Sequence, residues 1–222
     1  IAAQLFEKSA KQGYAPALYN LGVCYRTGKG VEQNYGEAAV WFKAAAEASD
    51  ACGQFSYAMC LADGVGVEED NSQAIKWVAL SAEQDYAPAK CYLGESYLNG
   101  DGVEEDKARG VKLLDEAAQD GYVPAMHALA ECYEKGNGVA ADLASAVRLY
   151  SSAAEEEYAP SQYSLAMLYD NGNGVERDYA KAVELYKQSA EQGYPAAQNA
   201  YGWCFIVGKV VKKDVYKLEI KK

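Results

Sequence analysis

The sequence predicts an all-α fold, a solenoid of antiparallel helix pairs that repeats every 36 residues. The first observation behind this prediction is a Gly-x-Gly-Val motif that recurs with a constant step. Its two glycines are Gly28 and Gly30, Gly64 and Gly66, Gly100 and Gly102, Gly136 and Gly138, and Gly172 and Gly174. A fixed period between about 20 and 50 residues is typical of solenoids. The second observation is that apolar residues recur at helical spacing on both sides of the motif, so that each period holds two amphipathic helices.

The period divides the chain into one solenoid domain, 1–222. Full repeats are expected at 13–48, 49–84, 85–120, 121–156 and 157–192. Residues 1–12 are predicted to be helix B of a partial repeat, and 193–222 a partial, divergent repeat with a basic tail. The unfinished last repeat favours a segment of a longer protein. Since one helix pair has too little apolar surface to bury alone, consecutive pairs are expected to share a core.

Helix A, the first helix of each repeat, is expected to begin at a proline column. A proline suits the first helical turn, whose N–H groups have no partners within the helix. The column holds Pro16, Pro88, Pro124 and Pro160. Ala17, Leu21 and Tyr25 then lie on one apolar face. A further column is always small and indicates close approach of a neighbouring helix; it holds Gly22, Ala58, Gly94, Ala130, Ala166 and Gly202.

Helix B, the second helix, is expected to begin at a column of Asn and Asp. Their short side chains accept hydrogen bonds from the free N–H groups of a first turn, so the column predicts N-caps. It holds Asn34, Asp70, Asp106, Asp142, Asp178 and Asp214. Behind the first cap, Ala38, Trp41, Phe42 and Ala45 form an apolar helical face.

The glycine motif is interpreted as the turn between helices A and B. A phosphate-binding loop would need a strand before the glycines, a helix directly after them, and a Lys-Ser or Lys-Thr at its end. No copy meets these requirements. The first glycine is instead expected to end helix A in the left-handed region, the second to permit the tight turn, and the valine to anchor the turn between helices.

Composition excludes several partner classes. The chain has 222 residues, of which 50% are hydrophobic, and a formal charge of -11. Such a charge argues against a nucleic acid as the main partner, which would require clustered Lys and Arg. There is no apolar run of about eighteen residues, so no membrane span is expected. The six cysteines suggest no obvious bridge and are interpreted as free thiols, which favours a reducing compartment such as the cytoplasm.

The repeated pattern resembles the Sel-1-like repeat, a relative of the tetratricopeptide repeat. The resemblance rests on several concordant columns over five copies and extends from residue 1 to about residue 208. In the first copy these are Ala17, Leu21, Gly22, Tyr25, Gly28, Gly30, Val31, Asn34 and Ala38. It implies an α/α right-handed superhelix with helix A on the concave face, used as an adaptor in protein complexes.

The resemblance and the residues both favour a protein that is not an enzyme. A cysteine-rich branch of the family, for which β-lactam binding or hydrolysis has been proposed, has disulfide-bridged repeats. This chain lacks cysteines at the corresponding positions and lacks a Ser-x-x-Lys motif. Cys91, Glu95, His127 and Glu131 fall in matching columns, but solvated groove side chains explain them better than a metal site. No cofactor and no metal are expected.

Two columns of helix A are predicted to line a binding groove, because they lie opposite the core stripe. The groove would be apolar at both ends and acidic in the middle. The candidate residues are Tyr19, Val23, Phe55, Met59, Glu95, His127, Glu131, Tyr163 and Met167, with Cys91, Asn199 and Trp203 in the same columns. We expect a protein or peptide partner with apolar anchors and some basic character.

Two alternatives stay open at this point. Any one of these groove side chains has about even odds of packing against the neighbouring repeat instead of facing a partner. The chain could also be a structural spacer within a larger protein, with no ligand in the groove. The sequence does not indicate the oligomeric state.

Overall fold

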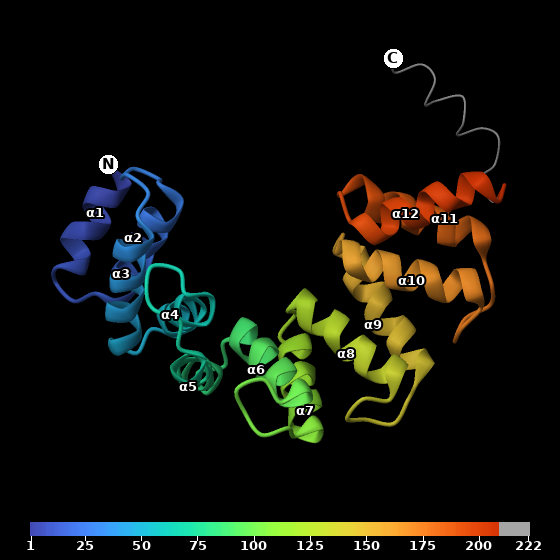
Figure 1. Ribbon diagram of the computed structural model, residues 1–222, viewed down its shortest axis with the longest axis horizontal. Coiled ribbons are helices and arrows are strands. Elements are labelled where there is room, and N and C mark those ends of the chain that lie inside the picture. Colours follow the sequence, from blue (N-terminus) through green and yellow to red (C-terminus); the bar gives the residue numbers. More distant parts are fainter. Residues whose placement is uncertain (209–222) are drawn as a thin grey trace, which may run out of the picture. The chain divides into compact units, whose positions relative to one another are not determined.

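The computed structural model describes residues 1–208, and every regular element in that part of the chain is an α-helix. The helices are α1 (Ala2–Ala10), α2 (Ala15–Thr27), α3 (Tyr35–Glu47), α4 (Ala51–Asp63), α5 (Asn71–Ala82), α6 (Ala87–Asn99), α7 (Lys107–Gln119), α8 (Val123–Lys135), α9 (Leu143–Glu155), α10 (Ala159–Asn171), α11 (Tyr179–Glu191) and α12 (Pro195–Ile206). The even-numbered helices from α2 onward are the predicted A helices, and α1 and the other odd-numbered helices are B helices (Figure 1). The all-α arrangement of antiparallel helix pairs is confirmed.

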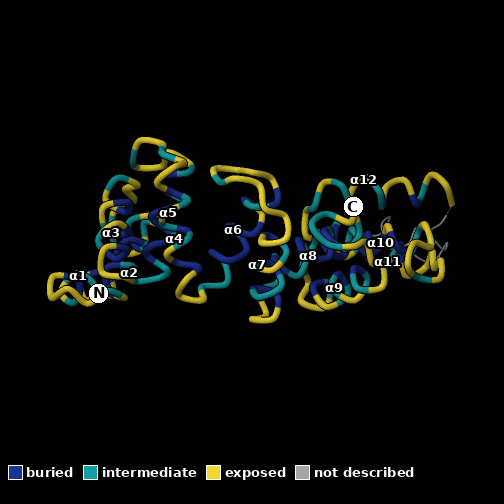
Figure 2. Tube along the Cα trace, turned by 90° about the horizontal axis from the view of Figure 1, so that it is seen from below, coloured by how far each residue is buried: buried dark blue, intermediate teal, exposed yellow. Residues whose placement is uncertain are grey.

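The helices fall into two compact units. Unit 1 comprises Ile1–Asp120 and holds α1–α7, and unit 2 begins at Gly121 and holds α8–α12. Within each unit every helix packs against the next one along the chain. Figure 2 shows buried stretches within the helices of each unit and exposed turns between them. The divergent turn residue Val210, the cap Asp214 and the basic tail lie outside the described residues.

Each complete A helix ends at the first glycine of the motif. Gly28 has φ +71° and its N–H donates to the carbonyl of Cys24, so the helix ends in the left-handed region. Gly30 also has positive φ, at +84°. The four later copies repeat both features. The interpretation of the motif as a turn is therefore confirmed.

The Asn and Asp column caps the B helices as predicted. The Asn34 side chain accepts a hydrogen bond from the Glu37 N–H at 3.0 Å, and Asp178 accepts one from Lys181 at 3.0 Å. Asp70, Asp106 and Asp142 cap α5, α7 and α9 in the same way. Each such cap typically contributes about 1 kcal/mol to helix stability.

The small column sets how closely helices A and B approach. A Cβ atom added to Gly22 would lie 2.7 Å from the ring of Phe42, which is fully buried. Gly94 lies in the same way against the Gly110 carbonyl and Leu114. The four cysteines beside the apolar stripe, Cys24, Cys60, Cys132 and Cys204, are buried, and no disulfide joins cysteines of the described chain. The close contacts of the small column and the burial of these four cysteines agree with the sequence analysis.

Polar contacts join helix A and helix B of the same repeat at a spacing of 30 residues. Ser81 Oγ donates to the Ala51 carbonyl at 2.7 Å, and Ser189 makes the same bond to Ala159. Two buried glutamines accept from glutamines of the following B helix, each at 2.8 Å; the pairs are Gln54 with Gln84 and Gln162 with Gln192. These bonds satisfy buried polar groups between the two helices of a pair.

Lys90 in α6 occupies the position equivalent to that of Gln54 and Gln162. Its side chain is only 7% exposed, and its Nζ lies 2.8 Å from Asp85 and 3.5 Å from both Glu116 and Asp120. Hydrogen bonding to Asp85 raises the pKa of Lys90, so the ammonium stays charged although it is enclosed.

Candidate functional site

The predicted groove residues form two columns on the A helices. The first column consists of Tyr19, Phe55, Cys91, His127, Tyr163 and Asn199. The second column, one turn further along each helix, consists of Val23, Met59, Glu95, Glu131, Met167 and Trp203. The first three members of each column belong to unit 1 and the last three to unit 2.

In unit 1 the first column packs into the helix stack. The ring of Tyr19 lies 5.9 Å from that of Phe42, and Phe55 lies 5.6 Å from Tyr86 of the next repeat. Cys91 is 5% exposed, and burial, with a smaller contribution from the charge of Glu95, raises the pKa of its thiol to about 12. Tyr19 and Phe55 keep part of their surface exposed, whereas Cys91 presents almost none.

In unit 2 the first column packs in the same way. Tyr163 lies 5.8 Å from the ring of Tyr186 and 5.5 Å from that of Tyr194. His127 lies 5.4 Å from Tyr150 and 5.5 Å from Tyr158. Each ring therefore contacts helix B of its own repeat and the start of the next repeat. Partial burial of these rings is the packing alternative that the sequence left open.

His127 makes polar contacts as well. Its Nδ1 lies 2.9 Å from Ser161 Oγ, and its Nε2 lies 3.9 Å from Glu131. Burial lowers the pKa of His127, while the nearby Glu131 carboxylate opposes that shift and the Lys135 ammonium adds to it. Serine, histidine and glutamate side chains thus adjoin one another, but Ser161 is completely buried and its hydroxyl cannot reach a substrate. The arrangement is a contact between repeats.

The second column is more accessible than the first. Val23 and Met59 are half-buried in unit 1, and Glu95 is exposed. In unit 2, Met167 is 39% exposed and Trp203 is 55% exposed. Exposed apolar side chains that gather on one helix face commonly mark a partner surface.

A third column of the A helices, which the sequence analysis did not single out, lies three residues after the second column and includes charged side chains. It contains Arg26, Ala62, Leu98, Glu134, Asp170 and Ile206. Arg26 lies 5.5 Å from the ring centre of Phe42, whereas Glu134 accepts a hydrogen bond from the Tyr150 hydroxyl at 2.8 Å. The signal in the sequence is that each of the first five members matches the residue sixteen positions later. The cation Arg26 is followed by a ring, the aliphatic members by aliphatic residues, and the acids by tyrosines.

A pocket of about 420 Å³ adjoins the exposed end of the second column in unit 2. Its lining residues are Asp170, Tyr186, Asn199, Ala200, Trp203, Cys204 and Val207. Burial raises the pKa of Tyr186, with a contribution from the Asp170 charge, so its hydroxyl is neutral at physiological pH. The pocket offers an aromatic wall and a carboxylate to a ligand.

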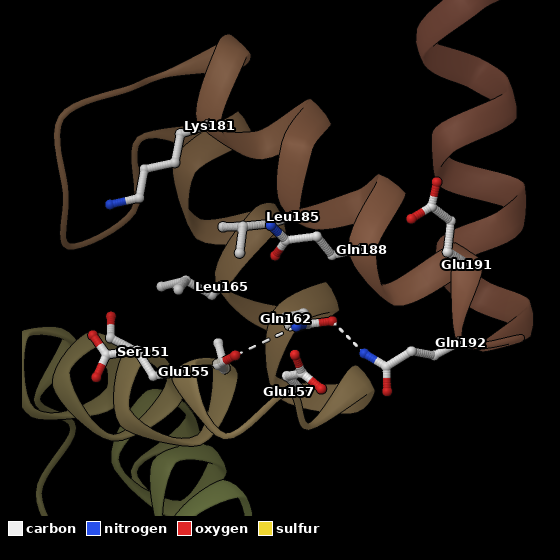
Figure 3. A pocket seen from close by; sticks show the side chains of 11 residues that line it. Ser151, Glu155, Glu157, Gln162, Leu165, Lys181, Leu185, Gln188, Glu191 and Gln192 are labelled. Carbon is white, nitrogen blue, oxygen red and sulfur yellow. Dashed lines mark hydrogen bonds between the residues drawn. The ribbon is translucent and has the colours of Figure 1, made fainter.

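A second pocket of unit 2, about 640 Å³ in volume, lies among α9, α10 and α11. Figure 3 shows Leu165 and Leu185 at its centre, with Lys181 at one end and the hydrogen-bonded Gln162 and Gln192 at the other. No predicted groove residue lines this pocket. Sequence reasoning missed it because its volume depends on side chains from three helices.

Other kinds of site find little support in the described part of the chain. Within residues 1–208, no three His, Cys, Asp or Glu side chains are grouped so that they could hold a metal ion. No described helix is both long and apolar enough to cross a membrane.

The Sel1 repeat family model matches seven segments of the chain, which together span most of it. They are residues 1–14, 15–50, 53–86, 87–122, 123–158, 159–194 and 195–217. A search of curated proteins found no match.

Solved structures similar to this chain include two with 30% identity or more. A Sel1 repeat protein from Oxalobacter formigenes is 30% identical, with a TM-score of 0.84, over 95% of this chain and 86% of its own. A protective antigen of uropathogenic Escherichia coli, described as having an SLR fold, is 32% identical, with a TM-score of 0.76. That match covers 91% of this chain but 44% of the antigen, so this chain spans less than half of the antigen's length. An immunity protein from Pseudomonas aeruginosa is 26% identical over 82% of this chain and 67% of its own, with a TM-score of 0.59.

Proposed function

Because the chain belongs to the Sel1 repeat family, we propose that it is a non-enzymatic scaffold that binds a protein or peptide partner along its helix A surfaces. Sel1 repeats commonly mediate protein–protein interaction and are generally scaffolds rather than enzymes. The partner contacts are assigned to the second column of each unit, supported by the first.

The observation that carries this proposal is the exposure of Met167 and Trp203 on the A helices of unit 2. Large apolar side chains are normally buried, and Trp is among the residues that contribute most to binding at interfaces. Trp203 also lines the pocket of about 420 Å³, which gives a partner side chain a place to insert.

Charge supports a partner with basic character. In unit 2, Asp170 lies on α10 with the exposed Met167, and Glu131 and Glu134 lie on α8, another A helix. In unit 1, Glu95 follows the apolar Val23 and Met59. A peptide with apolar anchors and basic residues complements both surfaces, and the charge of -11 on the whole chain attracts it.

The first column has a supporting function in this proposal. Tyr19, Phe55, His127 and Tyr163 present only their remaining exposed edges to a partner, because their ring faces contact other helices. They hold the A helices at fixed spacing and so position the second column. Substituting them would disturb the fold as well as the surface.

The test is an affinity pull-down that compares the wild-type chain with the double variant Met167→Ser, Trp203→Ser. We expect recovery of the wild-type partners to fall about tenfold or more, since the loss of one central anchor costs about 2 kcal/mol. The matched control is Val40→Ser, Leu80→Ser, which removes two exposed apolar side chains from B helices. The control should recover the same partners as the wild type.

Equal recovery by both double variants, with helicity intact, would remove the helix A surface from the proposal. It would leave the alternative of a spacer within a larger protein.

A further inference from the structure

The pocket among α9, α10 and α11 lies at a place that two other repeats fill with their own side chains. The repeat of 36 residues identifies the equivalent positions: Leu165 and Leu185 correspond to Tyr57 and Trp77 in unit 1, three repeats earlier. There the two rings pack edge to face, with centroids 5.9 Å apart. Unit 2 has two leucines in place of these rings.

The surroundings of the two places are alike in part. The hydrogen bond from Gln192 to Gln162 has the same 2.8 Å length as that from Gln84 to Gln54. Ala154, Glu155 and Glu191 of the pocket correspond to residues of the same type, Ala46, Glu47 and Glu83. Ser151, Glu157, Lys181 and Gln188 differ from their equivalents, which are Lys43, Ser49, Gln73 and Leu80. The loss of two rings is the change that removes aromatic side chains from the centre of the place.

One of the two repeats between these, 85–120, fills the place by other means. Its equivalents of Leu165 and Leu185 are also leucines, Leu93 and Leu113, but the equivalent of Gln162 is the enclosed Lys90. The Lys90 ammonium lies among three carboxylates there. One equivalent place thus holds an aromatic pair, another holds a cation, and the pocket of unit 2 has neither.

Charge favours a cation at the rim of this pocket. Glu155, Glu157 and Glu191 line it and make no ion pair within the described chain. The lining residue Lys181 is directed elsewhere, because its Nζ donates to the Tyr169 hydroxyl at 2.7 Å and lies 4.3 Å from that ring. The rim is consequently acidic and the centre apolar.

We propose that this pocket binds an aromatic side chain of a protein partner, with an adjacent lysine or arginine of that partner at the acidic rim. The aromatic ring would rest on Leu165 and Leu185 and replace the rings that unit 1 supplies itself. The basic group would pair with Glu155, Glu157 or Glu191. This surface comprises two B helices and the floor of α10, and it is separate from the second column of the A helices.

The experiment measures binding of the peptide acetyl-Lys-Trp-Lys-amide by calorimetry or by chemical-shift titration of the whole chain. We expect a dissociation constant of about 1 mM or below, as for a ligand with one anchor. Acetyl-Lys-Ala-Lys-amide and acetyl-Glu-Trp-Glu-amide should bind about fivefold more weakly or worse, because each lacks one of the two features.

Two variants close the pocket with the chain's own solutions. Leu185→Trp supplies the ring found at Trp77, and Gln162→Lys supplies the cation found at Lys90. Each should lower the affinity for the peptide about tenfold. Leu185→Trp should keep thermal stability, since another repeat already accommodates this residue. Gln162→Lys should lower thermal stability, because only Glu157 stands where Lys90 has three carboxylates. The reverse change, Trp77→Leu, should open a second binding place in unit 1.

Several results would overturn the proposal. One is that no binding is detected at a peptide concentration of 5 mM, about five times the expected dissociation constant. Another is that the wild type and Leu185→Trp bind the peptide with equal affinity. Self-association that Leu185→Trp abolishes would assign the pocket to a second copy of the chain instead. The variant Met167→Ser, Trp203→Ser should bind the peptide normally, so failure here is distinct from failure of the proposed helix A surface.

Discussion

His127 is a titratable ring that forms part of the packing between two repeats of unit 2. It contacts the rings of Tyr150 and Tyr158 and hydrogen-bonds Ser161, and its side chain is only 17% exposed. A protonated imidazole would carry a charge in this enclosed place, where it is poorly solvated. The protonation of one side chain therefore links the stability of unit 2 to pH.

We expect unit 2 to lose stability as the pH falls below about 6.5, the usual pKa of histidine. Burial lowers the pKa of His127 in the folded state, so as the pH falls the unfolded chain binds a proton before the folded chain does. The stability that neutral His127 contributes is therefore fully present above that pH and is lost below it. One such group contributes a slope of at most about 1.4 kcal/mol per pH unit. Urea unfolding at pH 7.5 and pH 5.5 measures it.

The control is His127→Gln, which keeps a polar partner for Ser161 but does not titrate. Its free energy of unfolding should change less between the two pH values than that of the wild type. The same pH dependence in both proteins would contradict the assignment to His127.

At the scale of helices, the small column decides how closely an A helix approaches its B helix. Gly22 lies under the ring of Phe42, and the ring has no space to move because Phe42 is fully buried. Gly202 occupies the same column in α12, but among residues 1–208 no atom lies within 4 Å of an added Cβ there.

We expect Gly22→Ala to destabilise unit 1 by about 1–3 kcal/mol, since the added methyl group overpacks a close helix contact. Gly202→Ala should instead be neutral or stabilise α12 by up to about 1 kcal/mol, because alanine favours a helix over glycine. Thermal unfolding of the two variants measures the difference. A similar effect of both substitutions would contradict the packing described for Gly22.

The sequence was sufficient to predict the helices, their caps and their turns, because these depend on residues close together along the chain. Asp178 caps α11 through the third following residue, and Gly172 ends α10 through its own backbone. Both signals are local, and the fixed period repeats each of them several times.

The candidate surfaces could be predicted only in part. A helical wheel placed Tyr163 and Met167 on one face, but the burial of Tyr163 depends on Tyr186 and Tyr194 from later elements. The pocket at Leu165 and Leu185 depends on side-chain size at two positions twenty residues apart. Such contacts follow from packing between repeats, which the period alone does not specify.

At the scale of the molecule, the described chain comprises two units, each with its own core. In unit 1 the core gathers around Phe42, Tyr57 and Val78, and in unit 2 around Tyr150 and Leu165. Solenoid stability is approximately a sum over repeats and their nearest-neighbour interfaces. Each unit holds enough helix pairs to bury a continuous core.

We therefore expect a fragment comprising residues 1–120 to fold without unit 2. It should keep a helical circular dichroism spectrum and unfold cooperatively, since two core clusters consist of buried residues from α1–α6, all before the boundary. The fragment begins at the first residue given and ends at the unit boundary, Asp120. A fragment that is unfolded at room temperature would show that unit 1 depends on contacts beyond this boundary.

The positions of the three tryptophans have a practical consequence for spectroscopy. Trp41 and Trp77 are half-buried in unit 1, whereas Trp203 is exposed in unit 2. The fluorescence of Trp203 should be emitted at longer wavelength and be quenched readily by iodide, and the other two should be more protected. A partner that covers the second column would shift the Trp203 emission to shorter wavelength, so binding can be followed without a label. The variant Trp203→Phe is the control, since it should show no such shift.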